Sequence, residues 1–206
     1  MIGALVVAGV SVKAETVRSL KRMGVRDSKT LSASQRDRLY DQILEKCERV
    51  STVQITPSEI DAVVSSGKKY RKLNHLEAIY FAKVIGGLGA TKVIVDASDT
   101  SPRRFRSVIM ENLRRRCTVV AAHKADRDFP VVSAASIVAK VERDRSVEKL
   151  RRKLGDFGSG YPSDPKTRAF FKEKMARGEP LPESARKSWK TWKRFGQSVF
   201  EAAGPQ

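Results

Sequence analysis

Short apolar runs separated by longer amphipathic stretches are the first pattern along the chain. Residues 2–12 are apolar and rich in β-branched side chains, so they predict a strand that is buried on both faces. Further short runs predict strands over residues 51–55, 92–96 and 117–122. The pattern therefore indicates strands that alternate with helices along the chain.

Helix starts are marked by two capping boxes. Ser32 and Gln35 form one box, and the helix that they begin is expected to run to about residue 48. Thr56 and Glu59 form the other, and its helix is expected to end at Gly67. Further helices are predicted over residues 74–85 with Asn74 as the cap, and over residues 102–116, 131–154, 167–176 and 185–203.

A glycine- and proline-rich segment separates the end of the chain from the rest. Residues 155–165 (GDFGSGYPSDP) include three glycines and two prolines, which exclude a regular helix or a central strand. We therefore expect a core over residues 1–154 and a substrate loop with a helical extension over residues 155–206. The extension carries aromatic residues at helical spacing, and we expect them to pack against the core rather than stack on bases: Trp189, Trp192, Phe195 and Phe200.

The charge of the chain changes this picture, because Lys and Arg number 41 against 23 Asp and Glu. The formal net charge is +18, and the phosphate backbone of nucleic acid is the commonest partner of such basic chains. The alternative is a basic protein whose charge only keeps it soluble. Composition alone leaves both interpretations open.

Cysteine and histidine usage excludes two classes of site. Cys47 and Cys117 are the only cysteines, which does not indicate a disulfide framework. With His75 and His123 as the only histidines, a zinc site of Cys and His ligands cannot be assembled at a standard spacing. No apolar run approaches the length of a membrane span, and the basic front of a signal peptide is lacking, so we expect a cytoplasmic protein without a membrane partner.

Carboxylates at strand ends are the candidate chemistry. Asp96 closes an apolar β-branched run, and Asp126 lies between the next predicted strand and a long predicted helix. Carboxylate oxygens bind hard cations such as Mg²⁺ or Mn²⁺, which assist phosphodiester hydrolysis. We interpret Asp99, in the turn before Pro102, as a helix cap or a surface ion pair.

Five ordered motifs now resemble a known family. They are Asp27-Ser28-Lys29, residues 93–96 (VIVD), residues 123–126 (HKAD) followed by 132–137 (VSAASI), residues 158–165 (GSGYPSDP) and residues 186–190 (RKSWK). Together they resemble type 2 ribonuclease H (ribonuclease HII), most closely its archaeal form. Five motifs in order are far more specific than any one of them.

The resemblance implies a metal-dependent endonuclease of DNA replication and repair. It would cut the RNA strand of RNA/DNA hybrids and duplex DNA at embedded ribonucleotides. The implied fold is α/β, a ribonuclease H-like mixed sheet flanked by helices, with a C-terminal helical extension. A monomer is expected, and a replication clamp partner is left unknown.

The resemblance also implies roles for individual residues. Asp96 and Asp126 match the third and fourth metal-binding carboxylates of the family, and the metal would be Mg²⁺ or Mn²⁺. Tyr161 matches the residue that stacks on the sugar after the ribonucleotide. Lys29 resembles a phosphate contact, and Arg186 and Ser188 are further expected substrate contacts.

One family motif has no counterpart in this sequence. Family members begin with a strand that ends Asp-Glu-x-Gly-Arg-Gly and supplies two further metal carboxylates. Residues 1–10 of this chain match the part of the family sequence that directly follows this motif. We expect this first strand to be missing through a start codon placed too late, and the chain as written to be poorly soluble and nearly inactive. The alternative is a shortened, catalytically inactive basic module that binds hybrid or duplex nucleic acid. A structural nucleoid-type protein would explain only the charge.

Overall fold

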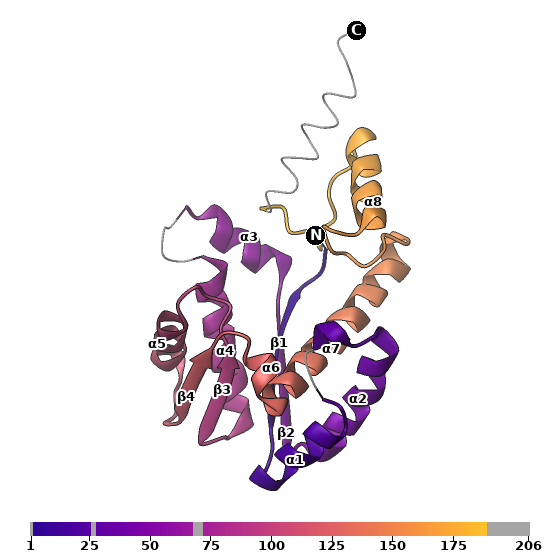
Figure 1. Ribbon diagram of the computed structural model, residues 1–206. Helices are drawn as coiled ribbons and strands as arrows, with labels where there is room; N and C mark the ends of the chain where they lie inside the picture. Colours follow the sequence, from indigo (N-terminus) through magenta and orange to yellow (C-terminus); the bar gives the residue numbers. More distant parts are fainter. Residues whose placement is uncertain (1, 26–27, 68–71, 189–206) are drawn as a thin grey trace. The chain divides into compact units, whose positions relative to one another are not determined.

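The computed structural model describes residues 2–25, 28–67 and 72–188 (Figure 1). Its elements are β1 (Leu5–Ser11), α1 (Ala14–Arg22), the 3₁₀ turn η1 (Ser28–Thr30), α2 (Ala33–Lys46), β2 (Arg49–Ile55), α3 (Pro57–Ser65), α4 (Leu73–Leu88), β3 (Lys92–Asp96), α5 (Pro102–Asn112), β4 (Thr118–Ala122), α6 (Ala125–Asp128), α7 (Pro130–Leu154) and α8 (Pro165–Ala176). Within these ranges, no helix has the length and apolarity that a membrane span requires.

The chain forms two compact units. One comprises residues 6–54 and 69–142 and is called the sheet unit here; the other comprises residues 1–5, 55–68 and 143–206 and is called the loop unit. The strands β1 and β2 and the helix α7 each continue from one unit into the other. The predicted division into residues 1–154 and 155–206 stays a prediction.

Paired strands organise the sheet unit. Among the described residues, β1 pairs with β2, and β3 pairs with β4 in parallel, with Asp96 opposite Ala122 at the last position of the ladder. The helices α4 and α5 cover the β3–β4 pair through a core that includes Ala82, Phe105 and Val119. Because β3 and β4 are parallel, their carboxyl ends lie at one edge.

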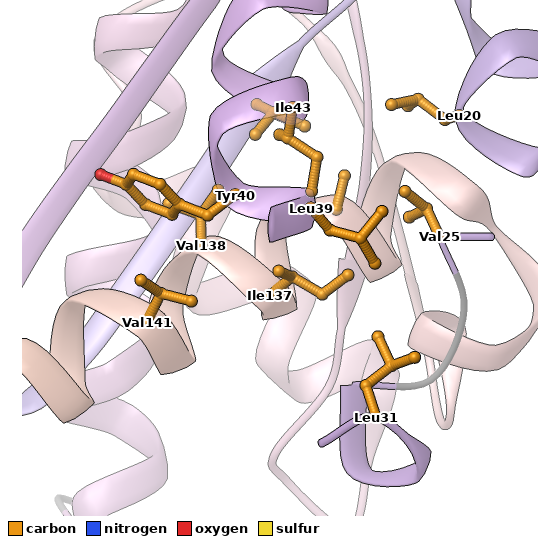
Figure 2. Close-up of a cluster of buried hydrophobic side chains, with 11 residues drawn as sticks. Leu20, Val25, Leu31, Leu39, Tyr40, Ile43, Ile137, Val138 and Val141 are labelled. Atoms are coloured by element: carbon orange, nitrogen blue, oxygen red, sulfur yellow. The ribbon is translucent and has the colours of Figure 1, made fainter. Parts of the chain in front are cut away.

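A second core of the sheet unit joins α2 to the first half of α7. Ile43 and Ile137 are fully buried there, and Leu20 anchors α1 to the same cluster (Figure 2). The hydroxyl of Tyr40 donates a hydrogen bond to Glu142 at the edge of this cluster. Glu142 on α7 thus provides a hydrogen-bond acceptor for the hydroxyl of Tyr40, while the ring of Tyr40 packs in the cluster.

The loop unit has its own core around Ile2, Phe157 and Phe171, all of which are buried. Ile2 forms an isolated antiparallel bridge with Ala185. Consequently residues near the two ends of the described chain, together with the glycine-rich segment, share one hydrophobic cluster.

The structure confirms both capping boxes and corrects several helix predictions. Ser32 and Gln35 cap α2, and Thr56 and Glu59 cap α3, by reciprocal hydrogen bonds. Asn74 does not cap α4, which begins at Leu73 after Lys72. Residues 185–188 are not helical, whereas Trp189, Trp192, Phe195 and Phe200 lie outside the described residues.

Two helices were not predicted. In α1, Leu20 is the only buried residue, so the segment lacks the wide apolar stripe that identifies a surface helix. The four-residue α6 follows Lys124, whose φ of 57° lies in the left-handed region. Lysine gives no sequence signal for that conformation, which glycine usually supplies.

Candidate active site

Asp96 lies at the carboxyl end of β3, where the sequence predicts it. The strand pair continues one step beyond it, because the N–H of Ala97 donates to the carbonyl of Ala122 at 2.9 Å. Oδ1 of Asp96 accepts a hydrogen bond from the N–H of Ala125 at 3.0 Å. The side chain is half-buried and is therefore held between the two strand ends with access to solvent.

Asp126 follows Ala125 in the first turn of α6 and is only 4% exposed. The left-handed Lys124 turns the chain sharply after β4, so that α6 begins directly beside the end of β3. The hydroxyl of Ser133 on α7 donates to the carbonyl of Asp126 and fixes this short helix. The structure thus brings both predicted metal ligands to one edge of the β3–β4 sheet.

The chemistry of these two side chains fits a hard divalent cation. Carboxylate oxygens are the ligands that Mg²⁺ and Mn²⁺ prefer, and both acids follow the ends of parallel strands. In residues 2–25, 28–67 and 72–188, no three Asp, Glu, His or Cys side chains converge as a metal cluster. Asp96 and Asp126 could therefore supply two ligands to such a cation, but not a full coordination shell.

Asp99 is engaged elsewhere. Its carboxylate accepts hydrogen bonds from Arg104 at 2.5 and 3.2 Å and from the N–H of Ser101 at 2.7 Å, and it is 8% exposed. Burial raises the pKa of Asp99, but these hydrogen bonds outweigh burial and leave the pKa lowered. Of the two predicted roles, the ion pair is confirmed, although Asp99 is buried and does not lie at the surface.

The Asp-Ser-Lys motif is tied to α7. Ser28 is fully buried and shares a 2.9 Å hydrogen bond with the hydroxyl of Ser136. The backbone of Lys29 belongs to η1, whereas its side chain lies outside the described residues. The backbone of the predicted phosphate contact is therefore fixed to the helix that follows Asp126.

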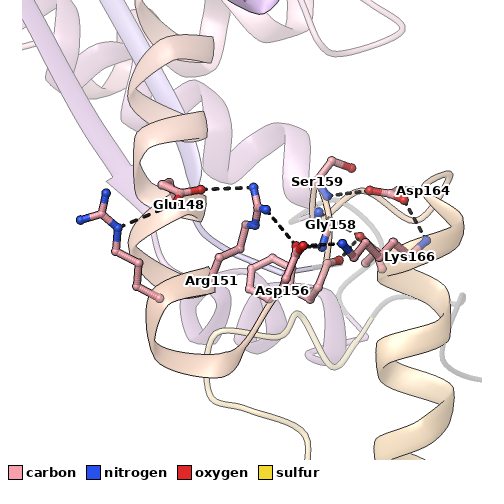
Figure 3. Close-up of polar contacts among 11 residues, drawn as sticks. Glu148, Arg151, Asp156, Gly158, Ser159, Asp164 and Lys166 are labelled. Atoms are coloured by element: carbon pink, nitrogen blue, oxygen red, sulfur yellow. Dashed lines mark hydrogen bonds and ion pairs between the residues drawn. The ribbon is translucent and has the colours of Figure 1, made fainter.

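Polar contacts hold the glycine-rich segment in a defined loop (Figure 3). Asp164 accepts from the N–H of Ser159 at 2.6 Å and caps α8 through the N–H of Lys166 at 2.9 Å. The hydrogen bonds from Ser159 lower the pKa of Asp164 to about 2. Gly158 has a φ of 76°, and a Cβ there would lie 2.5 Å from Oδ2 of Asp164, so the loop requires glycine at this position.

The loop is also tied internally by Thr167, which is buried. Its hydroxyl donates to the carbonyl of Phe157 and accepts from the N–H of Gly160. Arg151 adds ion pairs to Glu148 at 3.2 Å and to Asp156 at 2.9 Å. These bonds fix the parts of the glycine-rich segment that precede and follow Tyr161.

Tyr161 is displayed on the outside of this loop and is 40% exposed. The guanidinium carbon of Arg143 lies 3.9 Å from the centroid of its ring. The side chain of Arg143 is 12% exposed and is also paired with Asp144 at 3.0 Å. One face of the ring is thus occupied by a cation–π contact, which limits the orientations of the ring.

Arg186 and Ser188 are anchored to neighbouring backbone and side chains. Nε of Arg186 donates to the carbonyl of Gly3 at 3.0 Å, and Arg186 is buried. Ser188 donates from its N–H at 2.9 Å and from its hydroxyl at 2.6 Å to Asp61 on α3. The N–H of Lys187 donates to the other oxygen of Asp61 at 2.7 Å.

Asp61 and Arg143 are the residues that sequence reasoning missed. A signal for Asp61 exists, because α3 contains no Lys or Arg, and its other acid, Glu59, is used in the capping box. A carboxylate without a basic neighbour on its own helix is available to donors from other segments. For Arg143 the sequence gives no signal, since its partner Tyr161 lies in an irregular loop.

Replacing Asp61 with Asn is expected to destabilise the loop unit by ~1 kcal/mol, because water screens part of the three-fold hydrogen bonding. Burial raises the pKa of Asp61, whereas the bonds from Ser188 and Lys187 lower it and prevail. The stabilisation is therefore present above the unfolded pKa of ~3.9 and is lost as the pH falls through the folded pKa. Urea unfolding at pH 7 and below pH 3 measures this, and an equal difference at both pH values would contradict it.

The predicted site residues divide between the two units. Asp96, Asp126 and the backbone of Lys29 belong to the sheet unit, and the first two lie together. The loop unit carries Tyr161, Arg186 and Ser188.

Comparison with known proteins identifies the family. The family model described as ribonuclease HII matches residues 1–192. Ribonuclease HII of Pyrococcus horikoshii is 38% identical over 193 residues, which cover 93% of this chain and 85% of the relative. Ribonuclease HII of Pyrococcus abyssi is 40% identical over 204 residues, covering 98% of this chain and 88% of the relative.

Solved structures show the same fold. The crystal structure of ribonuclease H2 from Pyrococcus horikoshii OT3 matches with a TM-score of 0.85 and 37% identity, over 97% of this chain and 93% of that chain. Ribonuclease HII from Archaeoglobus fulgidus, solved in a complex with PCNA, matches with a TM-score of 0.82 and 40% identity, over 92% of this chain and 89% of that chain. The predicted ribonuclease H-like α/β fold is confirmed. The chain belongs to the ribonuclease HII family and is a hydrolase of the ribonuclease H type.

Proposed function

We propose that this chain cuts the RNA strand of RNA/DNA hybrids, and duplex DNA at embedded ribonucleotides, with Mg²⁺ or Mn²⁺ as cofactor. The observation that carries the proposal is the placement of Asp96 and Asp126 at one sheet edge, linked by the bond from Ala125 to Asp96. The net charge of +18 supports a polyanionic substrate. Family membership supports the reaction class.

The residues around the two acids have distinct tasks in this proposal. When bound, the divalent cation activates the attacking water and stabilises the leaving oxygen. Asp96 and Asp126 would hold it, and the N–H of Ala125 orients the carboxylate of Asp96. Ser133 keeps α6 in place through the carbonyl of Asp126. Lys29 is the proposed phosphate contact.

Tyr161 is proposed to read the sugar that follows the ribonucleotide. Because Arg143 covers one face of the ring, the opposite face is the one offered for stacking. Arg186 and Ser188 are retained as proposed substrate contacts, and their bonds to Gly3 and Asp61 hold the segment that presents them.

A cleavage assay tests the proposed function. Three labelled duplexes are compared, an RNA/DNA hybrid, a DNA duplex with one ribonucleotide and an all-DNA duplex as control, each with Mg²⁺, Mn²⁺ or EDTA. Cleavage of the first two, only with a divalent cation, is the expected result. Tight binding of the hybrid without cleavage in any metal would instead favour the non-cutting nucleic-acid-binding module.

Tyr161→Ala is expected to lower cleavage at a single ribonucleotide by roughly 10-fold, in line with a stacking energy of ~1–3 kcal/mol per aromatic contact. Binding to an all-DNA duplex should change little, because stacking on one sugar matters only when the junction is aligned. Tyr161→Phe is the matched control, since it keeps the ring and the contact with Arg143. Equal losses in cleavage and in all-DNA binding would show that Tyr161 only packs its own loop.

A sliding clamp is a proposed protein partner. The basis is the likeness to the Archaeoglobus fulgidus protein, which was solved in a complex with PCNA. Calorimetric titration of this chain with an archaeal PCNA should show saturable binding. A flat titration at high micromolar concentrations would remove the clamp as a partner.

A further inference from the structure

Three basic side chains that the proposed reaction does not use line a pocket on α1. Arg18, Lys21 and Arg22 line an open pocket of ≈ 540 Å³. All three are exposed, while Leu20 on the same helix is fully buried in the core of the sheet unit. The helix is therefore anchored by its apolar side and presents a cationic one.

The spacing explains why the three cations converge. Residues three and four positions apart are neighbours on a helix surface, so Arg18 lies beside both Lys21 and Arg22. Within the described part of the chain, none of the three side chains makes a hydrogen bond or an ion pair. Like charges at this spacing destabilise a helix, and a bound anion would relieve that repulsion.

The negative end of the helix dipole explains only part of this arrangement. Lys21 and Arg22 lie in the last turn, where cations interact favourably with the dipole. Arg18 lies a turn earlier, and a dipole interaction does not require three cations to line one pocket. The pocket points instead to a multiply charged anion.

Nucleic acid fits this chemistry better than a single small anion. A phosphodiester backbone offers repeated charges that several cations can neutralise together. The pocket also lies just before η1 in the sequence, and η1 carries Lys29, the proposed phosphate contact. We propose that the α1 pocket binds the phosphodiester backbone of the duplex, as a contact surface additional to Asp96 and Asp126. This proposal rests on the proposed function in taking a duplex as the ligand.

Substitution with glutamine tests the pocket, because Gln keeps helix propensity while it removes charge. The test variant is Arg18→Gln, Lys21→Gln and Arg22→Gln together. The control variant is Arg38→Gln, Lys46→Gln and Lys92→Gln, which removes three exposed cations that lie on α2 and β3. Both variants lower the net charge equally, so a difference between them reports the pocket and not the overall field.

Binding is measured by fluorescence anisotropy on a ribonucleotide-containing duplex in EDTA over a range of salt concentrations. The slope of log K against log [salt] is expected to decrease in magnitude by about 2.7 in the test variant, since each of the three lost phosphate contacts removes ~0.9. The Kd at moderate salt should weaken by about tenfold or more in the test variant. In the control variant, the slope should stay within about 0.5 of the parent value.

Cleavage kinetics distinguish a failure of the pocket proposal from a failure of the proposed nuclease function. With a cutting parent, the test variant should show a raised KM and an unchanged kcat. If the parent binds duplex without cutting, the proposed function fails, and a selective loss of affinity in the test variant still supports the pocket. Equal slopes and affinities in the two variants overturn the pocket proposal even when the parent cuts. Saturable binding of inorganic phosphate with unaltered duplex affinity also overturns it, in favour of a small-anion site.

A single substitution keeps the test decisive if the triple variant unfolds. Arg18→Gln alone should lower the salt slope by about 0.9, and the matched single control is Arg38→Gln. An unchanged slope in the folded Arg18→Gln variant would overturn the proposal. Circular dichroism melting of each variant shows whether it is folded.

Discussion

Asp96→Asn is expected to reduce cleavage by about 10³-fold or more, because loss of a metal-binding carboxylate removes several kcal/mol of transition-state stabilisation. The amide oxygen of Asn can still accept the hydrogen bond from the N–H of Ala125, so the strand end should keep its geometry. Duplex affinity in EDTA should therefore stay within about twofold of the parent, since a change that keeps the size and the hydrogen bond of the side chain moves free energy by ~0.5 kcal/mol.

Single-turnover cleavage in Mg²⁺ and anisotropy in EDTA measure the two effects of Asp96→Asn separately. Asp128→Asn is a suitable control, because Asp128 is an exposed acid on α6, close to the same sheet edge. Retained cleavage in both metals would mean that Asp96 is only a structural residue of the strand end.

Asp126→Asn is expected to slow cleavage by roughly 10–100-fold, which is a smaller loss than that of Asp96→Asn. Asp126 lies at the start of a helix, a position suited to managing the water or the leaving group rather than to holding all of the charge. The same single-turnover assay measures the rate. If Asp126→Asn and Asp96→Asn lose equal activity, the two acids do not divide the work in this way.

The melting temperature of Asp126→Asn, compared with that of the parent, shows whether the substitution destabilises the fold. The side chain of Asp126 is 4% exposed, so part of any activity loss can arise from repacking of α6. Comparison with Ser133→Ala, which removes the hydrogen bond to the carbonyl of Asp126, measures the effect of loosening α6 without removing the carboxylate. A rate as low in Ser133→Ala as in Asp126→Asn would assign the role of Asp126 to folding.

Local signals in the sequence were sufficient for most helices and strands of the chain. The capping boxes at Ser32 and Thr56 are closed by partners three residues away, so short-range pattern determines them. Asp96 was found because β-branched runs that end in an acid place it at a strand end. By contrast, α6 follows a left-handed Lys124, a conformation for which lysine has no local signature.

The contacts of the loop unit were harder to predict because they join distant residues. Asp61 and Ser188 are 127 positions apart, and Arg143 meets Tyr161 through a loop whose shape depends on Asp164 and Gly158. Periodicity informs on which face of an element is buried, but not on which loop lies against it. The candidate carboxylates were therefore predictable, and their supporting residues were not.

The pairing of Gly3 with the far end of the chain has a consequence for biosynthesis. Gly3 donates to the carbonyl of Ser184 at 2.8 Å and accepts from Arg186, 183 positions away. Ile2 donates to Gly160 at 3.2 Å. During translation, these backbone groups cannot form their native hydrogen bonds until almost the whole chain has emerged from the ribosome. The loop unit is therefore expected to close last, and contacts of such high sequence separation slow folding and favour aggregation.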